Sequence, residues 1–490
     1  MICSLLAACT PGPKYHAPAP PPLAAKSYKE STVNFQNTEG WKVASPQEGM
    51  LRGKWWEIFH DPELNGYEEQ LDINNQNIKQ YFENFMAARA MVREARAQYW
   101  PTITTGPSWN RSKTSGNLGR SSTANAGSTA SIWSFPLDVS WTPDFFGKIR
   151  NEVREAEFGA QVSAGDLENE RLLEQATLAE TYFQLRGQDA LEKVLNDTVE
   201  SDKKALELNK TLYDTGINDY LSVAAAESTL KSAESAALNV GVLRAQYEHA
   251  IATLLGKPAS DFSIAVKPLL IVPPPIPTGV PSQLLERRPD VAAAERTVAE
   301  ANATIGIGYG AFFPSVTLSA AGAFEATTFT HWFDWPSRFW SIGANTSQLL
   351  FDGGLYRAEL HQYEATYNAD VAIYRQTVLT AFQQVEDYLA ASRILSQQVI
   401  KQREAVEAEQ TTLDLEMTRF QTGIDPYLLV TTAQVTLLSD QESLVTLQIQ
   451  EAVASIELIQ ALGGGWDLTE LPTPAQVSSK PAKGDYSIQR

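Results

Sequence analysis

The chain has 490 residues, of which 39 are Lys or Arg and 58 are Asp or Glu, so its formal net charge at pH 7 is -19. This length allows two or three ordinary domains, and the excess of acid without a basic stripe argues against nucleic acid as a partner. We interpret the acidity as a source of solubility, with an acidic, cation-attracting lumen or mouth as the alternative.

The N-terminal stretch "MICSLLAACT" contains both cysteines of the chain, Cys3 and Cys9. Disulfides and thiolate metal sites are therefore not expected elsewhere. The residues up to Cys9 look like a bacterial lipobox, so residues 1–8 are predicted to be the remnant of a short signal peptide and Cys9 to carry a covalent lipid. An incidental cysteine in a disordered terminus is the alternative. Residues 9–55 include "TPGPKYHAPAPPPLAA" and are predicted to lie extended over a surface.

A nearly repeated turn indicates an internal duplication. The stretch "YDTGINDYL" at residues 213–221 returns as "FQTGIDPYL" at 420–428, so Gly216 and Gly423 are 207 residues apart, as are Arg150 and Arg357. We predict two structural repeats, 56–257 and 284–464, joined by a Pro-rich linker at 258–283 and followed by a mobile tail at 465–490.

Helices are predicted where apolar residues recur at alternating intervals of three and four, as at Val223, Ala226, Leu230 and Ala233. This 3.5-residue repeat is typical of supercoiled helices. The predicted helices span 62–98, 147–213 and 219–255 in the first repeat, and 289–309, 354–420 and 427–462 in the second. A continuous helix over 147–213 would be about 100 Å long. The core of an ordinary helical bundle is the alternative.

Strands are predicted between the helices, at 101–111, 132–142, 314–325 and 339–350. The second alternates in period two between Trp133 and Trp141. Each has about the length that a tilted membrane strand needs, whereas no apolar run is long enough for a transmembrane helix. Four strands cannot close a barrel and an open edge is excluded in lipid, so several copies must pool strands, and a trimer with twelve would leave a lumen. A soluble mixed sheet packed on helices is the alternative.

Several motifs together indicate a family. They are "PGPKY", the Trp55-Trp56 pair with "DPELN", "PSQLLERRPDVAAAERTVAEANATIGI", "FFPSVTLS" and both "TGI" turns. The chain resembles the TolC-like outer membrane efflux factors of Gram-negative bacteria, in particular the OprM and NodT lipoprotein branch that serves RND-type tripartite systems. The resemblance implies an α+β membrane protein, a homotrimer whose 12-stranded β-barrel, with four strands per chain, is continued by a long α-helical coiled-coil barrel.

The same resemblance implies a function and partners. It implies a passive exit duct for drugs or other toxic small molecules, lipid-anchored in the outer membrane and extending into the periplasm. A periplasmic adaptor of the membrane fusion class, an inner membrane transporter and outer membrane lipid are the implied partners. A type I protein secretion channel and a non-conducting envelope rod remain alternatives. The five histidines are isolated and no catalytic constellation occurs, so neither an enzyme, a metal site nor a cofactor besides the lipid is expected.

By similarity, the two turns form the periplasmic tip where the adaptor docks and the tunnel closes. The candidate residues are Thr215, Gly216, Asp219, Tyr220, Leu221, Thr422, Gly423, Asp425, Tyr427 and Leu428. The glycines allow the positive φ of a tight reversal. The family's gate uses carboxylates slightly farther along, where this chain has Leu429 and Thr432, so Asp425 is the gate candidate. A purely structural turn is the alternative for these side chains.

Overall fold

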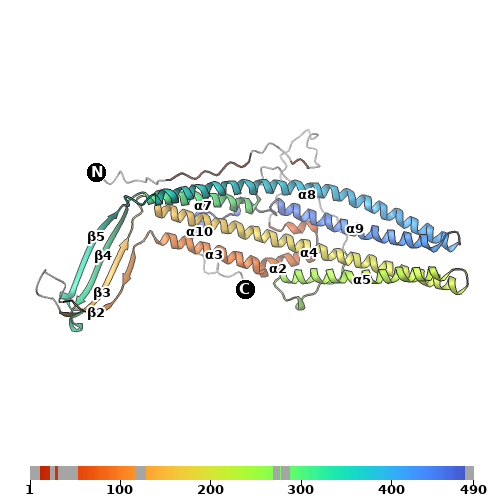
Figure 1. The fold of residues 1–490 in the computed structure, drawn as a ribbon, viewed down its shortest axis with the longest axis horizontal. Coiled ribbons are helices and arrows are strands. Elements are labelled where there is room, and N and C mark those ends of the chain that lie inside the picture. Colours follow the sequence, from red (N-terminus) through yellow and green to blue (C-terminus); the bar gives the residue numbers. More distant parts are fainter. Residues whose placement is uncertain are drawn as a thin grey trace.

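The protein is an elongated body with a small sheet at one end and two helical turns at the other (Figure 1). A computed structural model describes residues 12–21, 28–30, 53–115, 128–268, 276 and 287–479. Cys9 and residues 1–8 lie outside the described residues, as do parts of the segments 9–55 and 258–283.

Long helices form most of the described chain. The first half contains α2 (Pro62–Asn74), α3 (Gln76–Ala97), α4 (Lys148–Asp214) and α5 (Tyr220–Leu254). The second half contains α7 (Pro289–Ala311), α8 (Leu355–Gln421), α9 (Tyr427–Ala461) and the short α10 (Pro474–Ser478). Because α4 and α8 both have 67 residues and α5 and α9 both have 35, the two halves contain matching hairpins.

The helices pack side by side along the body (Figure 1). α3 and α7 lie along the part of the long helices that is nearer the sheet, with α7 between α4 and α8, while α5 and α9 lie along the distal part. α4 also contacts α9, and a Cβ at Gly187 of α4 would lie 2.1 Å from Cδ1 of Ile449. Glycine at this position therefore allows the two hairpins to approach closely.

The sheet is antiparallel and contains β1 (Thr102–Thr105), β2 (Ser108–Lys113), β3 (Thr129–Trp141), β4 (Ser315–Ala326) and β5 (Arg338–Ser347). β1 and β2 both pair with β3, β3 pairs with β4, and β4 with β5. The β3–β4 pair thus joins the two halves of the chain. The predicted strand 339–350 ends earlier, at Ser347.

The single strand predicted at 101–111 is wrong, because Gly106 and Pro107 separate β1 from β2. Both pieces keep one register against β3, in which Thr105 lies opposite Leu137. Proline has no N–H to donate to a ladder, so the interruption follows from Pro107 and from Pro136 on the facing strand. The sheet therefore has four strands in width.

The single helix predicted at 62–98 is also wrong. Asn75 ends α2 and caps α3, its Oδ1 accepting from the N–H groups of Asn77 at 2.8 Å and Ile78 at 3.0 Å. Its Nδ2 donates to Glu174 Oε2 of α4 at 2.9 Å and to the carbonyl of Leu254 at 3.0 Å. Asn thus supplies both a preferred N-cap and a link between elements.

The mobile tail predicted at 465–490 is wrong for its first part. Residues 465–479 include α10 and pack on α3 and α4. Val477 is buried with Val92 and Ala160, and Gln161 Nε2 donates to the carbonyl of Pro472 at 2.8 Å. Buried apolar contacts therefore hold this segment in place, and residues 480–490 lie outside the described residues.

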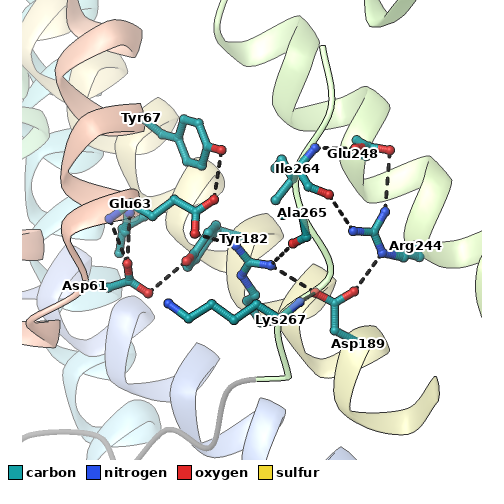
Figure 2. A network of polar contacts seen from close by, with 12 residues as sticks. Asp61, Glu63, Tyr67, Tyr182, Asp189, Arg244, Glu248, Ile264, Ala265 and Lys267 are labelled. Carbon is teal, nitrogen blue, oxygen red and sulfur yellow. Dashed lines mark hydrogen bonds and ion pairs between the residues drawn. The ribbon is translucent and has the colours of Figure 1, made fainter. Parts of the chain in front are cut away.

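A buried charge network, which we call the Arg186 network, lies where α2, α4 and α5 meet (Figure 2). Arg186 is 0 % exposed and binds Glu63 at 2.6 Å and Asp189 at 3.0 Å. Asp189 also binds Arg244 at 2.7 Å. The two arginines donate to the carbonyls of Ala265 and Ile264, each at 2.7 Å. Because every ion in it is paired, the network tolerates burial and fixes the segment after α5.

Candidate functional site: the two helical turns

The two turns share one backbone geometry. Gly216 has a φ of 76° and Gly423 a φ of 74°, a left-handed conformation that favours glycine. The N–H of Gly216 donates to the carbonyl of Tyr213, and that of Gly423 to the carbonyl of Phe420, both at 2.9 Å. These bonds satisfy the carbonyls that each preceding helix leaves without partners.

The threonines before the glycines also behave alike. Thr215 Oγ1 donates to the carbonyl of Thr211 at 2.9 Å, and Thr422 Oγ1 donates to that of Thr418 at 3.0 Å. Both side chains therefore bond back to the last turn of their own helix. Thr215 and Thr422 thus have a structural role in ending α4 and α8.

The starts of the following helices differ. Asp219 caps α5, because its Oδ1 accepts from the N–H of Ser222 at 3.2 Å. The equivalent position before α9 is Pro426, which gives no side-chain cap. Asp425 instead forms an ion pair with Arg419 of α8, and this hydrogen bond holds the pKa of Asp425 below its ordinary value.

Large apolar side chains are exposed around both turns. They are Ile217, Tyr220 and Leu221 at the first turn, and Ile424 and Leu428 at the second. Both turns are at the end of the body that is opposite the sheet (Figure 1). A gathered set of exposed apolar groups is typical of a surface that binds another protein.

Tyr427 is not at the exposed tip, so that part of the prediction is wrong. Its side chain is 3 % exposed, and its ring lies 5.1 Å from that of Phe420. Its hydroxyl donates to Gln434 Oε1 at 3.5 Å. The α4 helix contributes Val199 and Leu206 to the cluster that contains Tyr427. Tyr427 therefore helps to hold the two hairpins together.

Asp202 of α4 completes this contact. Gln434 Nε2 donates to Asp202 Oδ1 at 3.0 Å, whereas Oδ2 is buried and has no hydrogen-bond partner among the described residues. Burial raises the pKa of Asp202 to about 6, because desolvation penalises the charged carboxylate. We call this Asp202–Gln434–Tyr427 chain the inter-hairpin contact.

The sheet end has two bands of aromatic contacts. Toward the loops, the ring of Trp133 lies 5.6 Å from Trp109 and 5.3 Å from Trp332. Toward the helices, Phe146 stacks on Phe313 at 5.0 Å. All ten residues of β5 have exposed side chains, in a strand that is one edge of the sheet. The sheet of one chain therefore leaves a wide surface uncovered.

Within the described parts of the chain, no helix combines the length and apolar composition that a membrane-crossing helix requires. The same residues contain no group of three or more His, Cys, Asp and Glu side chains able to hold a metal ion.

The comparisons with known proteins establish the family. The family described as "Outer membrane efflux protein" matches residues 69–257 and 280–464, so this chain belongs to it. The predicted resemblance to outer membrane efflux factors is thus confirmed. The members that this chain matches are efflux and channel proteins rather than enzymes.

Individual relatives agree with this assignment. The chain is 30% identical to the antibiotic efflux pump outer membrane protein ArpC of Pseudomonas putida, with 94% of each protein covered. It is 29% identical to the toluene efflux pump outer membrane protein TtgC of the same species, again with 94% of each covered. The solved outer-membrane channel OprN is 26% identical, with a TM-score of 0.83 over 94% of this chain and 100% of that one. These matches confirm the predicted fold class, strands continued by long coiled helices with an internal duplication.

Sequence reasoning missed three residues that form contacts at or near the turns, Asp202, Gln434 and Arg419. Asp202 did carry a signal, because it lies between Val199 and Leu206 in the same alternation of three and four. A polar residue at such a seam position is buried, and polar seam residues fix register between helices. Arg419 gave no comparable signal, since its partner lies beyond the turn.

Proposed function

We propose that this chain is the outer membrane exit duct of a tripartite efflux pump. Three copies form a passive conduit through which drugs or other toxic small molecules leave without chemical change. Membership of the outer membrane efflux protein family, together with a four-strand-wide sheet that has two open edges, carries this proposal. Known relatives named as antibiotic and toluene efflux components support the choice of small molecules as cargo.

Assembly follows from the edges of the sheet. β1 with β2 forms one edge and β5 the other, and unpaired edge groups are excluded in a hydrocarbon environment. Three copies joined edge to edge give a closed barrel of twelve strands. The α4–α5 and α8–α9 hairpins of the copies then continue the barrel as a coiled-coil tunnel into the periplasm.

The tips supply the contacts with partners. The exposed residues Tyr220, Leu221 and Leu428 offer apolar side chains to a periplasmic adaptor, which connects the duct to an inner membrane transporter. That transporter supplies the energy. Asp425 is the proposed gate residue, and three copies of its carboxylate around the axis attract cations. The guanidinium of Arg419, which forms an ion pair with Asp425 in each copy, partly neutralises that negative charge.

Lipidation of Cys9 is the proposed anchor in the outer membrane. The cysteine follows small residues in a lipobox-like stretch. A lipid there tethers the N-terminal segment, of which Tyr15 contacts Glu295 and Phe158 in the body. Mass spectrometry of the membrane-extracted protein is expected to show an acylated Cys9, and Cys9→Ser is expected to remove that mass without abolishing the fold.

The central test is conduction. Purified protein in a planar bilayer is expected to give discrete single-channel currents, and its mass in detergent is expected to equal three chains. Deleting the gene is expected to sensitise the cell to small toxic compounds and not to stop export of a protein. A monomer without conductance would contradict the proposal and favour a non-conducting envelope rod. Loss of protein export alone would favour a type I secretion channel.

A further inference from the structure

An arginine-rich pocket lies where the helices meet the sheet. It has a volume of about 380 Å³ and is lined by Arg96, Tyr99, Trp100, Arg150, Arg154 and Glu157 among others. Arg96 and the two aromatic residues come from the end of α3 and the connection to β1. Arg150 and Arg154 come from the first two turns of α4, directly after β3. The elements that line the pocket therefore meet at the helical end of the sheet, and Figure 1 shows this junction of α3 and α4 with the strands.

The positive charge of this pocket is only partly neutralised. Arg150 binds Asp144 at 3.1 Å and Arg96 binds Glu157 at 3.2 Å. Arg154 forms no ion pair with the described residues and donates only to the amide oxygen of Asn151, at 3.4 Å. A guanidinium in this position can accept an added anion, because planar paired donors match phosphate oxygens.

A further arginine, Arg93, lies one helical turn before Arg96 and outside the residues that line the pocket. Arg93 of α3 has a buried Nη1 without a hydrogen-bond partner among the described residues. A buried donor without a partner is costly. Residues 93–96 and 150–154 together contain four arginines and two glutamates, so they are locally basic in a chain whose net charge is -19.

The aromatic residues match a membrane boundary. Trp100 is 75% exposed, and the indole N–H of Trp141 donates to the carbonyl of Tyr99 at 3.0 Å. Exposed Trp and Tyr beside arginines are typical of the level at which lipid headgroups lie. The arginines and these aromatic residues therefore lie at the same level of the body, where the helices meet the sheet.

The second half of the duplicated chain lacks this pocket. The spacing that relates Pro101 to Pro314 places Tyr309 at the position of Arg96, and the 207-residue interval places His361 at that of Arg154. Only Arg150 has a basic equivalent, Arg357. If these arginines merely stabilised a helix–sheet junction, both junctions would need them.

We propose that this pocket binds the phosphate of an anionic glycerophospholipid headgroup from the adjoining leaflet. This inference rests on the proposed placement of the sheet in the outer membrane. The guanidinium groups of Arg96 and Arg154 hold the phosphate oxygens, while Trp100 lies against the glycerol region. The volume admits a phosphate with its glycerol and leaves the acyl chains outside. Bound lipid fixes the depth of the sheet in the bilayer.

Native mass spectrometry of the full-length protein tests this proposal. The detergent-solubilised protein is incubated with phosphatidylglycerol, or with phosphatidylcholine as a zwitterionic comparison. The wild-type protein is expected to retain phosphatidylglycerol about ten-fold more than Arg96→Gln/Arg154→Gln does, and phosphatidylcholine weakly. Arg357→Gln is the matched control from the second half and is expected to behave as wild type. Equal retention by wild type and the double variant overturns the proposal.

Two further measurements separate the remaining outcomes. Tryptophan fluorescence during a titration with inorganic phosphate is expected to change only at millimolar concentrations, and saturation at micromolar phosphate overturns the lipid source. If the double variant fails to fold, Arg154→Lys keeps the charge, loses the paired donors and is expected to lower retention about three-fold. A wild-type channel that conducts without retaining lipid refutes this inference alone, whereas absent conductance refutes the proposed function.

Discussion

At the first turn Tyr220 is 61% exposed, whereas at the second the equivalent Tyr427 is 3% exposed. The backbones of the two turns agree within 2° in φ at Gly216 and Gly423. The difference arises from packing, because Tyr427 is buried against α4 of the other hairpin, whereas Tyr220 contacts Tyr213 of its own hairpin and stays exposed. Duplication has thus kept the backbone of the turn and changed its neighbours, so that this tyrosine is exposed at the first turn and joins the two hairpins at the second.

The long helices differ between the halves in the same way. Arg186 of α4 is fully buried between Glu63 and Asp189, while its equivalent in α8, Arg393, is partly exposed and binds Glu30 at 2.6 Å. Arg186 is therefore part of the buried core, whereas Arg393 links α8 to the N-terminal segment that contains Glu30. Matched substitutions in the two halves can therefore separate the shared scaffold from the acquired roles.

The largest difference in stability is expected between substitutions of the equivalent arginines, Arg186 and Arg393. Arg186→Met removes the ion pair with Glu63 and leaves the buried Asp189 with Arg244 as its remaining basic partner, so it is expected to lower the free energy of unfolding by about 3 kcal/mol. Arg393→Met removes a partly exposed pair and is expected to cost less than about 1 kcal/mol. Denaturant unfolding in detergent measures both. Similar losses in the two variants would show that the Arg186 network is not a core element.

The next largest difference in stability is expected between substitutions of the equivalent tyrosines, Tyr427 and Tyr220. Tyr427→Ala empties a buried aromatic site and is expected to destabilise the inter-hairpin contact by about 3 kcal/mol, whereas Tyr220→Ala is expected to cost less than about 0.5 kcal/mol. Hydrogen exchange of α9 amides near the turn reports the first effect. Tyr220→Ala is expected instead to weaken adaptor binding, and unchanged binding would exclude Tyr220 from the docking surface.

The two glycines are expected to behave alike. A Cβ at Gly216 or Gly423 meets no atom within 4 Å, so alanine suffers only from the positive φ, which costs about 1–2 kcal/mol. Gly216→Ala and Gly423→Ala are therefore expected to lower the stability of their hairpins equally, measured by hydrogen exchange. A cost at one turn only would mean that the shared backbone geometry is not what these glycines provide.

Asp202 is expected to make the inter-hairpin contact pH-dependent. Its pKa rises from the ordinary 3.8 to about 6 in the folded protein, so the folded state binds a proton that the unfolded state lacks between these values. The stabilisation is complete below the lower value and is lost as pH rises through the upper one. Asp202→Asn is expected to be more stable than wild type at pH 7.5, by about 1 kcal/mol.

The stability of Asp202→Asn must be compared with that of the wild-type protein at each pH. Glu180 and Glu300 have pKa values raised by burial to about 7, so overall stability changes with pH in both proteins. The informative quantity is the difference between wild type and Asp202→Asn, which is expected to shrink as pH falls toward 4. A difference that does not vary with pH would show that Asp202 is not charged in the contact at neutral pH.

Periodicity predicted the helical hairpins because apolar spacing is a local property of the chain. The break at Asn75 escaped it, since the cap depends on partners in α4 and α5 that lie far along the sequence. The packing of residues 465–479 was missed for the same reason, because a polar segment gives little sign of the surface that Trp466 and Val477 cover.

The candidate site, like the fold, has features that the sequence predicts and features that depend on contacts between distant segments. The positive φ of Gly216 and Gly423 could be predicted, because glycine in a repeated turn has a local cause. The burial of Tyr427 could not, because it depends on how α4 of one hairpin meets α9 of the other. The aromatic period of β3 indicated a strand, yet the interruption at Gly106 and Pro107, beside Pro136 of the facing strand, was visible only once the register was known.

The smallest effect on stability is expected at Asp425, where the interest lies in conduction. The first-half equivalent of Asp425 is Asn218, whose Nδ2 donates to Asn209 Oδ1 at 3.2 Å. Asp425→Asn therefore gives the second turn the residue of the first, and because its partner Arg419 is exposed, folding is expected to change little. In the proposed trimer this substitution removes three carboxylates and keeps three arginines. Single-channel recordings are expected to show weaker block by divalent cations and an altered conductance.

Asp219→Asn, which changes an equal charge at the first turn, is expected to leave both the block and the conductance unchanged. Identical currents from wild type and Asp425→Asn would exclude Asp425 as the gate, and an equal response to Asp219→Asn would assign the effect to general surface charge.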